Sequence, residues 1–457
     1  MGAFLAILFW LALMALFVYV FVKYRQIVNR SKVGDDMVYR RYCNALNNSE
    51  MHNLIISGGK ALDRFQAITS ILNEAYSQRI PTIVLHSGFA PFNHFTQDTY
   101  FDPCIGTDSD EIAEFLTDAA ANAMNIDSVV HSSIKFMVDV LKAVNENITL
   151  ADVVKFPCDD VISLLDDYKE REQITSSQYD KFKQRYNNPA IRDNILRVVP
   201  LLSKLKPLTQ RSGTAQPINL QQAVTERRIL FFDLLTDSNA VLKELVFSAI
   251  NKLTEVSKFW VITEGISFMG KAESKVDTVF TKNRNNITLV YSGDDVPALT
   301  SQTEQTFNTL TGSNSQLLLF AHTAGSSAIR WSEHFGEEFQ SKEMETRSRG
   351  VFNPLNRQKG GQKGAEKAFR FPPQHFQHIA KTTDINNRQV TWGLNEGECY
   401  FIDENNTMLE SQKPKPRGII EHLIYFAMKS PVPDGRTEYS LPKIALQYIP
   451  LQITVGQ

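Results

Sequence analysis

The first 24 residues form a continuous apolar segment that differs from the rest of the chain. No charged residue occurs from Gly2 to Val22, and at about 1.5 Å per residue a helix of this length reaches roughly 30 Å, the thickness of a hydrocarbon core. A cleaved secretory signal has a basic start, a shorter apolar region and a small-residue cleavage site, and the segment has none of these. It therefore predicts a transmembrane anchor over residues 1–24.

Basic residues follow this anchor and none precedes it: Lys23, Arg25, Arg30, Lys32, Arg40 and Arg41. The positive-inside rule places such residues on the cytoplasmic side. We expect a single-pass protein of the cytoplasmic (inner) membrane, with its N-terminus outside and the bulk of the chain in the cytoplasm.

After the anchor, the apolar pattern changes from strand to helix and back. Leu54 to Ser57 is typical of a buried strand, Asp63 to Arg79 has helical spacing of apolar residues, and Ile80 to Leu85 is a second apolar run. A strand, a helix and a strand with short links form a βαβ unit, which implies a parallel sheet with a right-handed crossover.

From about residue 103 to 225 the pattern is helical, with periods interrupted by polar turns; strand patterns then return. Near-continuous apolar runs indicate parallel strands covered on both faces, and these four runs alternate with helical segments: 227–235, 258–265, 286–293 and 315–322. The pattern predicts one α/β domain in two parts, residues 25–102 and 226–340, split by an inserted all-α domain over 103–225.

Residues 341–370 are rich in Gly, Lys, Arg, Asn and Gln. We expect a basic flexible linker, with contact to nucleic-acid phosphates or to an anionic membrane surface as the alternative. The residues that would make such a contact are Arg347, Arg349, Arg357, Lys359 and Lys363. Residues 371–457 predict a short helix and a hairpin in a segment that packs on the α/β domain.

The composition excludes few classes of function. The net charge of −2 and the 43% apolar content describe a globular body without an overall electrostatic preference for nucleic acid. The four cysteines are far apart in sequence and have no neighbouring histidine pair, so we expect reduced thiols and no metal site. His86, His375 and His378 likewise have no carboxylate or cysteine at ligand spacing.

The candidate chemistry lies in "NLIISGGKALDRF", which has the strand, loop and helix layout of a phosphate-binding loop. Such a loop needs glycine amides and a lysine for the phosphates and a hydroxyl for Mg²⁺. If Gly59-Lys60 is the GK pair, the loop would begin inside the strand, and Ala61 would replace the hydroxyl. If Gly58 is the first glycine, the layout fits, but Arg64 stands in the lysine position and Phe65 in the hydroxyl position. Phe65 cannot bind a metal, and arginine does not replace a compact ammonium.

A second half of such a site is an apolar strand ending in carboxylates. "FWVITEG" has Thr263 in the position of the metal-linked carboxylate and retains Glu264 as a candidate catalytic base. Asp233, after "ILFF", is a rival that is better explained as a capping residue. A weak signal for a polar sensor lies at the end of a later strand, in Ser292, Asp294 and Asp295.

In the order of these segments, the chain resembles the conjugative coupling proteins of type IV secretion systems, the TraG/TraD group of the FtsK/HerA-type RecA-like ATPases. The resemblance covers most of the chain and runs through "LIISGGKALDRF", the helical insertion, "ILFFDLL", "FWVITEGISFMG" and the segments that follow. It implies a P-loop NTPase-type parallel sheet, secretion-channel partners, DNA or a relaxase as substrate, and a hexameric ring. Family members carry lysine, threonine and aspartate at the positions matched to Arg64, Phe65 and Thr263, and they have two membrane helices.

These departures lead to a membrane-anchored pseudo-ATPase that docks substrate, channel partners or an active ATPase paralogue, with a degenerate nucleotide site at Gly58, Gly59 and Arg64 and no cofactor. The alternative is an active ATP-driven DNA or protein translocating motor that uses ATP and Mg²⁺ through Arg64 and Glu264. A third hypothesis is a membrane-tethered α/β protein of unrelated function.

Overall fold

The structure is a computed structural model of the chain. It describes residues 2–31, 35–47, 53–89, 92, 99–209, 215–235, 238–253, 258–266, 287–300, 304–312, 315–349, 357–383, 389–412, 415–416, 418–427 and 437–452. The part of the predicted strand-and-helix region at 267–286 lies outside these residues.

The centre of the molecule is a mostly parallel sheet of eight strands, which confirms the predicted α/β class. Its order is β16-β13-β8-β1-β7-β6-β2-β5. The strands from β8 to β5 are all parallel, and β13 runs antiparallel to β8. The bounds are β1 (Asn53–Ser57), β2 (Thr82–His86), β5 (Ile229–Asp233), β6 (Phe259–Glu264), β7 (Ile287–Gly293), β8 (Ser315–Phe320), β13 (Glu398–Ile402) and β16 (Lys443–Ala445).

The sheet is covered on both faces, as its unbroken apolar strands require. Alternate residues of one strand point to opposite faces, so Leu54 and Ile56 enter one buried cluster while Ile55 enters the other. The covering helices are α2 (Asp35–Asn47), α3 (Ala61–Ser77), α12 (Ser238–Lys252), α14 (Val296–Leu299), α15 (Glu304–Thr311) and α16 (Gly325–Phe335).

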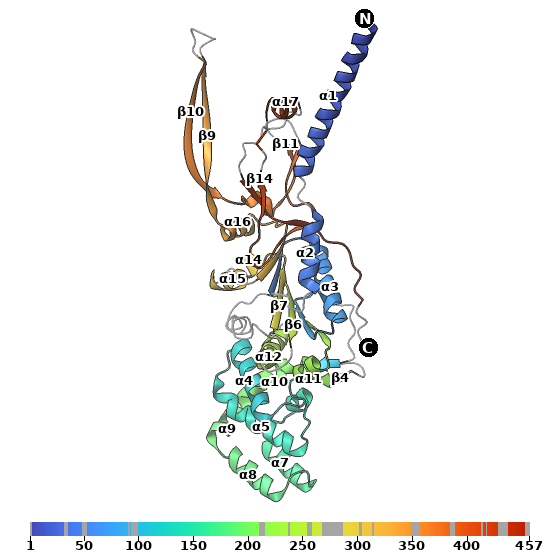
Figure 1. Cartoon of the computed structure of the whole chain (residues 1–457). Coiled ribbons are helices and arrows are strands. Elements are labelled where there is room, and N and C mark those ends of the chain that lie inside the picture. The colour runs from blue at the N-terminus through green and yellow to red at the C-terminus, as the bar shows by residue number, and fades with distance from the viewer. Residues whose placement is uncertain are drawn as a thin grey trace.

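Helices fill the segment between β3 (Thr99–Phe101) and β4 (Gln216–Ile218), two short strands that pair in parallel. They pack against the sheet domain through α12 and lie at the end of the molecule opposite to the N-terminus (Figure 1). The helices are α4 (Ser109–Met124), η2 (Ser128–Val130), α5 (His131–Val144), α6 (Leu150–Val154), α7 (Val161–Glu170), α8 (Ser176–Tyr186), α9 (Pro189–Ile195), η3 (Leu196–Val198) and α10 (Val199–Thr209). The short helix α11 (Leu220–Thr225) follows β4 and leads to β5.

Local chemistry sets the ends of these helices. Thr149 and Asp152 form a reciprocal capping box at the start of α6, and Thr175 and Gln178 do the same for α8. The helical period predicted across 149–171 is divided into α6 and α7 because Pro157 lacks the amide that a helix interior needs.

Helix α1 (Gly2–Ser31) extends away from the body (Figure 1). Its segment Ala6–Arg25 is long and apolar enough to cross a membrane, and none of it is buried against the rest of the chain. The predicted anchor is therefore one apolar helix whose hydrophobic segment is not buried by the described residues.

The expected flexible linker over 341–370 is instead a long antiparallel hairpin, which projects from the body (Figure 1). It consists of β9 (Glu337–Arg349) and β10 (Arg357–Phe369). The strands pair in an unbroken register from Arg357 opposite Arg349 to Phe369 opposite Glu337. A two-stranded ribbon outside the main sheet needs no apolar alternation, so the sequence pattern could not indicate these strands.

The C-terminal part also differs from the expectation of a local hairpin. Strand β13 pairs with β8 of the main sheet rather than with its neighbour in sequence. The remaining elements are η5 (Pro373–Phe376), β11 (His378–Thr383), β12 (Gln389–Gly393), β14 (Leu409–Gln412), α17 (Ile419–Ala427) and β15 (Thr437–Ser440). The short helix predicted in this part is limited to the single turn of η5.

Candidate functional site

The candidate site lies where the carboxyl ends of the parallel strands meet. Strand β1 is central, between β8 and β7, and the crossover helix α3 carries the chain from β1 over to β2 on the β7 side. Ligands of open α/β sheets bind outside the carboxyl ends of the strands at such a change of direction. The loop Gly58–Lys60 occupies this position, directly after β1 and before α3.

The backbone amides of this loop are all engaged within the protein. Gly58 N donates to Gly293 O at 3.1 Å and Gly59 N donates to Ala321 O at 2.8 Å. Lys60 N donates to Asp63 Oδ2 at 2.9 Å. A phosphate loop works by directing successive free amides at the ligand. Here the three amides donate instead to acceptors at the ends of neighbouring strands and in the first turn of α3.

The loop is also pressed against β8 and the residues that follow it. A Cβ atom on Gly58 would lie 2.7 Å from Phe320 O and 2.9 Å from His322 Cε1, and one on Gly59 would lie 2.8 Å from Phe320 Cβ. Both glycines have positive φ, at 85° and 71°. The two glycines therefore serve a close approach to protein rather than to a ligand.

Arg64 closes the space beyond the loop. Its Nε donates to Glu264 Oε1 at 2.9 Å, and its Nη1 donates to Gly59 O at 2.9 Å and to Gly58 O at 3.4 Å. The two side chains of the ion pair are only 9% and 3% exposed. The structure thus brings together all four residues that the sequence singled out for the nucleotide site, and it joins the two charged groups to each other.

Phe65 and Thr263 have structural contacts in place of metal chemistry. The Phe65 ring packs against Phe89 and Phe92, with ring centroids 6.2 and 5.9 Å away. Thr263 is fully buried and its Oγ1 donates to Val290 O at 3.4 Å, inside the sheet. The loop residues therefore do not fit a magnesium nucleotide: their amides are already bonded, Phe65 has no hydroxyl, and Thr263 stands in place of the second carboxylate among the described residues.

A buried polar group that the sequence did not single out lies beside the loop. Ser57 Oγ is 2.8 Å from His322 Nε2, which also accepts a hydrogen bond from Trp331 Nε1 at 3.1 Å. Val296 N donates to Ser57 Oγ. Because the indole can only donate, Nε2 is an acceptor and the imidazole proton belongs on Nδ1. Burial lowers the pKa of His322 to about 4, which agrees with a neutral ring.

Three buried polar atoms at this edge have no hydrogen-bond partner among the described residues: Glu264 Oε2, Ser292 Oγ and His322 Nδ1. Glu264 and Ser292 are direct neighbours in the β6–β7 register. Unpaired buried groups destabilise a fold and mark sites with a retained role. The position of His322 at the end of the last apolar strand, "LLLFAH", was the signal that could have identified it.

The other candidates have structural roles. Asp233 accepts hydrogen bonds from Gly88 N and Leu235 N and therefore holds two turns. His86 is buried, with its pKa lowered by burial. Asp295 caps α14 through Ala298 N and accepts a hydrogen bond from Ser327, while Asp294 is exposed. The described residues hold no group of three side chains suited to a metal ion.

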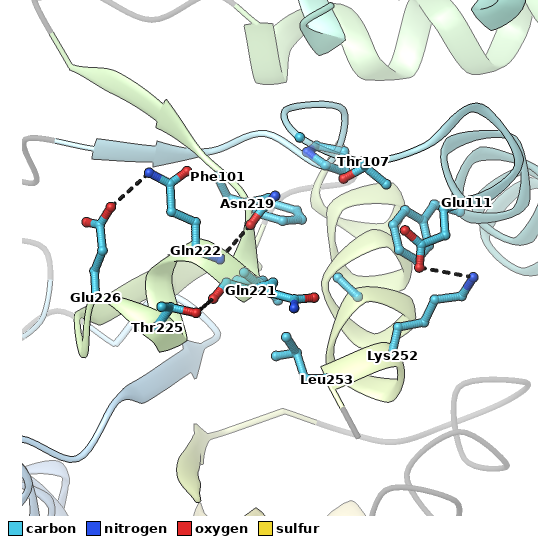
Figure 2. A pocket seen from close by; sticks show the side chains of 15 residues that line it. Phe101, Thr107, Glu111, Asn219, Gln221, Gln222, Thr225, Glu226, Lys252 and Leu253 are labelled. Atoms are coloured by element: carbon cyan, nitrogen blue, oxygen red, sulfur yellow. Dashed lines mark hydrogen bonds and ion pairs between the residues drawn. The ribbon is translucent and has the colours of Figure 1, made fainter. Parts of the chain in front are cut away.

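The described cavities include one of about 440 Å³ between the sheet domain and the helical insertion, lined from α4, α11 and α12 (Figure 2). Lys252 pairs with Glu111, and Glu226 accepts a hydrogen bond from Gln222 (Figure 2) and pairs with Arg228. Each of the three charged residues that line the cavity is therefore already paired with an opposite charge.

Comparison with known proteins finds similarity only at the level of the fold. The sequence matches no protein-family model and no curated protein. Among solved structures, the chain is similar to the bacterial conjugative coupling protein TrwBdeltaN70 in its unbound monoclinic form. The TM-score is 0.46 and the identity 9%, and the match covers 78% of this chain and 82% of that chain.

Two further structures give matches of the same kind. The plasmid coupling protein TrwB in complex with ADP and Mg²⁺ has a TM-score of 0.43 and 9% identity, covering 91% of this chain and 88% of that chain. VirB4 of Thermoanaerobacter pseudethanolicus has a TM-score of 0.36 and 10% identity, covering 63% and 81%.

Proposed function

We propose that this chain is a membrane-anchored, coupling-protein-like component of a type IV secretion or conjugation system that docks partners and does not hydrolyse ATP. One observation carries the second half of this proposal. The buried Arg64–Glu264 ion pair occupies the edge of the sheet where a triphosphate would bind, beside a loop whose amides are already bonded.

The pairing opposes nucleotide binding on energetic grounds. To contact a phosphate, Arg64 would have to leave Glu264 and two backbone carbonyl groups, and Glu264 would remain buried without a partner. Leaving one charge of a buried pair unpaired costs about 3–5 kcal/mol. Nucleotide binding would have to offset this free-energy cost, and Phe65 has no hydroxyl group with which to bind the metal ion.

The secretion role follows from the order of the elements. An apolar helix, the first strand with its loop, a helical insertion and the remaining parallel strands follow one another along the chain, in the order on which the resemblance to coupling proteins was based. Basic residues follow the apolar segment of α1, beginning with Lys23 and Arg25, which favours a cytoplasmic location for the body. The proposed partners are secretion-channel proteins, an active ATPase paralogue, and DNA or a relaxase, in an oligomer that the resemblance makes a hexameric ring.

The test is Mg²⁺-dependent ATP binding by the full-length chain in detergent micelles. We expect no saturable binding up to millimolar ATP and no hydrolysis above that of a buffer control. Saturable micromolar binding that is lost in Arg64→Ala and retained in Arg171→Ala would overturn the proposal and favour the motor. Arg171→Ala is a suitable matched control because the Arg171 side chain is 69% exposed and lies in the helical insertion.

The docking role is tested separately in cells that encode the chain. Crosslinking followed by purification of the full-length protein should recover components of a secretion channel or DNA-processing proteins. Recovery of neither class, from cells in which the secretion system is assembled, would favour a membrane-tethered protein of unrelated function.

A further inference from the structure

Helix α17 carries an apolar face that nothing in the described chain covers. Ile419, Leu423 and Phe426 are 79%, 59% and 80% exposed. Their spacing of four and three residues places them in one stripe along the helix. On the opposite side, Glu421, Ile424 and Tyr425 are buried against the protein.

A two-stranded ribbon holds helix α17 outside the body. Strands β14 and β15 pair in an antiparallel ribbon, and α17 lies in the connection between them. This excursion begins and ends between β13 and β16, which both belong to the main sheet. The ribbon thus carries α17 away from the sheet, toward the end of the molecule from which α1 projects (Figure 1).

Helix α17 reaches the anchor itself. It contacts α1, and the apolar segment of α1 is wholly exposed. The exposure of Phe17 in α1, at 68%, is comparable to that of the α17 face. Helix α17 therefore lies beside the anchor, close to any lipid that surrounds α1.

Length and flanking charge distinguish α17 from a second transmembrane span. Its nine residues reach only about half of the roughly 30 Å hydrocarbon core. Basic residues flank it in the sequence, with Lys413, Lys415 and Arg417 before it and Lys429 after it. Short apolar helices with basic flanks lie in the boundary between headgroups and acyl chains, where anionic lipids attract the flanks.

We propose that α17 inserts its Ile419, Leu423 and Phe426 face into the lipid of the membrane that α1 crosses and so forms a second, non-spanning contact. This rests on the membrane anchoring by α1 and is independent of the nucleotide site. The body is then attached to the membrane at two points, which limits its rotation about the axis of α1.

The test uses the full-length chain with Cys43→Ser, since the other three cysteines are buried. Phe426→Cys is labelled with an environment-sensitive fluorophore after reconstitution into phosphatidylcholine vesicles containing phosphatidylglycerol. Leu196→Cys is the matched control, because Leu196 is an exposed apolar residue of the helical insertion. Leu13→Cys in α1 reports on the anchor.

We expect nitroxide-labelled lipid to quench most of the emission from positions 426 and 13 but not from position 196, and aqueous iodide to show the reverse order. Quenching of position 426 by iodide, with position 13 still quenched by lipid, would overturn the inference and leave the anchoring intact. Loss of lipid quenching at position 13 would instead refute the anchoring itself. Protection of position 426 from both quenchers would mean that protein covers the helix and would also overturn the inference.

Discussion

Arg64→Ala is the substitution that tests the closed site most directly. The change removes the Nε–Glu264 contact of 2.9 Å and the hydrogen bond to Gly59 O, and it leaves Glu264 with both oxygen atoms unpaired in a side chain that is 3% exposed. Because both partners are buried, solvent screening reduces the effect little, and the expected destabilisation is about 3–5 kcal/mol.

The loss is local, so a global melting curve of a chain with a separate helical insertion is a poor measure of it. Hydrogen exchange of the amides in β1, α3 and β6 reports on the region itself. Since about 1.4 kcal/mol corresponds to a tenfold change in an equilibrium constant, those amides should exchange at least on the order of a hundredfold faster, while amides of α4 and α5 stay unchanged.

Two further variants serve as controls for the Arg64→Ala prediction. Arg171→Ala removes an arginine from an ion pair whose side chains are 69% and 60% exposed, and it should cost less than about 1 kcal/mol. The double variant Arg64→Met with Glu264→Gln removes both charges and should recover most of the loss, because no charge is left unpaired. If Arg64→Ala changed exchange in β1 no more than Arg171→Ala does, the ion pair would not hold the site and the argument would fail.

Other predictions concern the surroundings of the site and the hairpin. Burial lowers the pKa of His322 to about 4 from an unfolded value of about 6.5, so the chain takes up a proton when it unfolds between these pH values. The free energy of unfolding should therefore fall as the pH decreases from about 6.5 to about 4. In denaturation experiments His322→Gln should show a weaker dependence of this free energy on pH, and an equal dependence would contradict the argument. Gly58→Ala should destabilise the protein more than Gly397→Ala in thermal denaturation, since both have positive φ but only Gly58 has neighbours within 4 Å of the added Cβ. Asp102→Ala removes the acceptor for Leu150 N and Cys104 N and should cost about 1–3 kcal/mol, measured as faster exchange in α6; unchanged protection would refute that role. If the β9–β10 hairpin binds DNA, the affinity of the full-length chain should fall steeply with salt, and glutamine at Arg347, Arg349, Arg357, Lys359 and Lys363 should flatten that slope, whereas glutamine at Lys181, Lys204 and Lys206 of the helical insertion should not.

The sequence predicted the parallel sheet and the helical insertion because both have strong periodic patterns. Continuous apolar runs predicted β1, β2, β5, β6, β7 and β8 close to their observed bounds, and the helical pattern over 103–225 predicted the insertion as a whole. The bounds of its single helices are harder to derive, since "SSQYDKFKQRY" of α8 buries only Tyr179 and Phe182, too few apolar positions to define a face.

Long-range pairing was beyond what local pattern contains. The sequence 398–402 is as apolar as a hairpin strand, and nothing in its composition indicates that it joins the sheet beside β8. The candidate site shows the same difference between local features, which the sequence indicates, and long-range contacts, which it does not. The residue types at Arg64, Phe65 and Thr263 were enough to suggest a degenerate nucleotide site, which remains a proposal. The ion pair between Arg64 and Glu264 could not be predicted, because it joins residues 200 positions apart. The Ser57–His322 contact is similarly distant, with 265 positions between its partners.

The packing of helix α2 against residues of β13 and β16 has a consequence for biosynthesis. Helix α2 follows the anchor directly, and its Tyr42 packs edge-on against Phe401, while Arg41 pairs with Asp403. Ile444 of β16 belongs to the same buried cluster as Val38 and Tyr42. During synthesis α1 and α2 are made long before the residues that hold α2, since the partners of the Arg41–Asp403 pair are 362 positions apart. A chain whose α1 has already inserted into a membrane is therefore tethered there while α2 still lacks its packing partners.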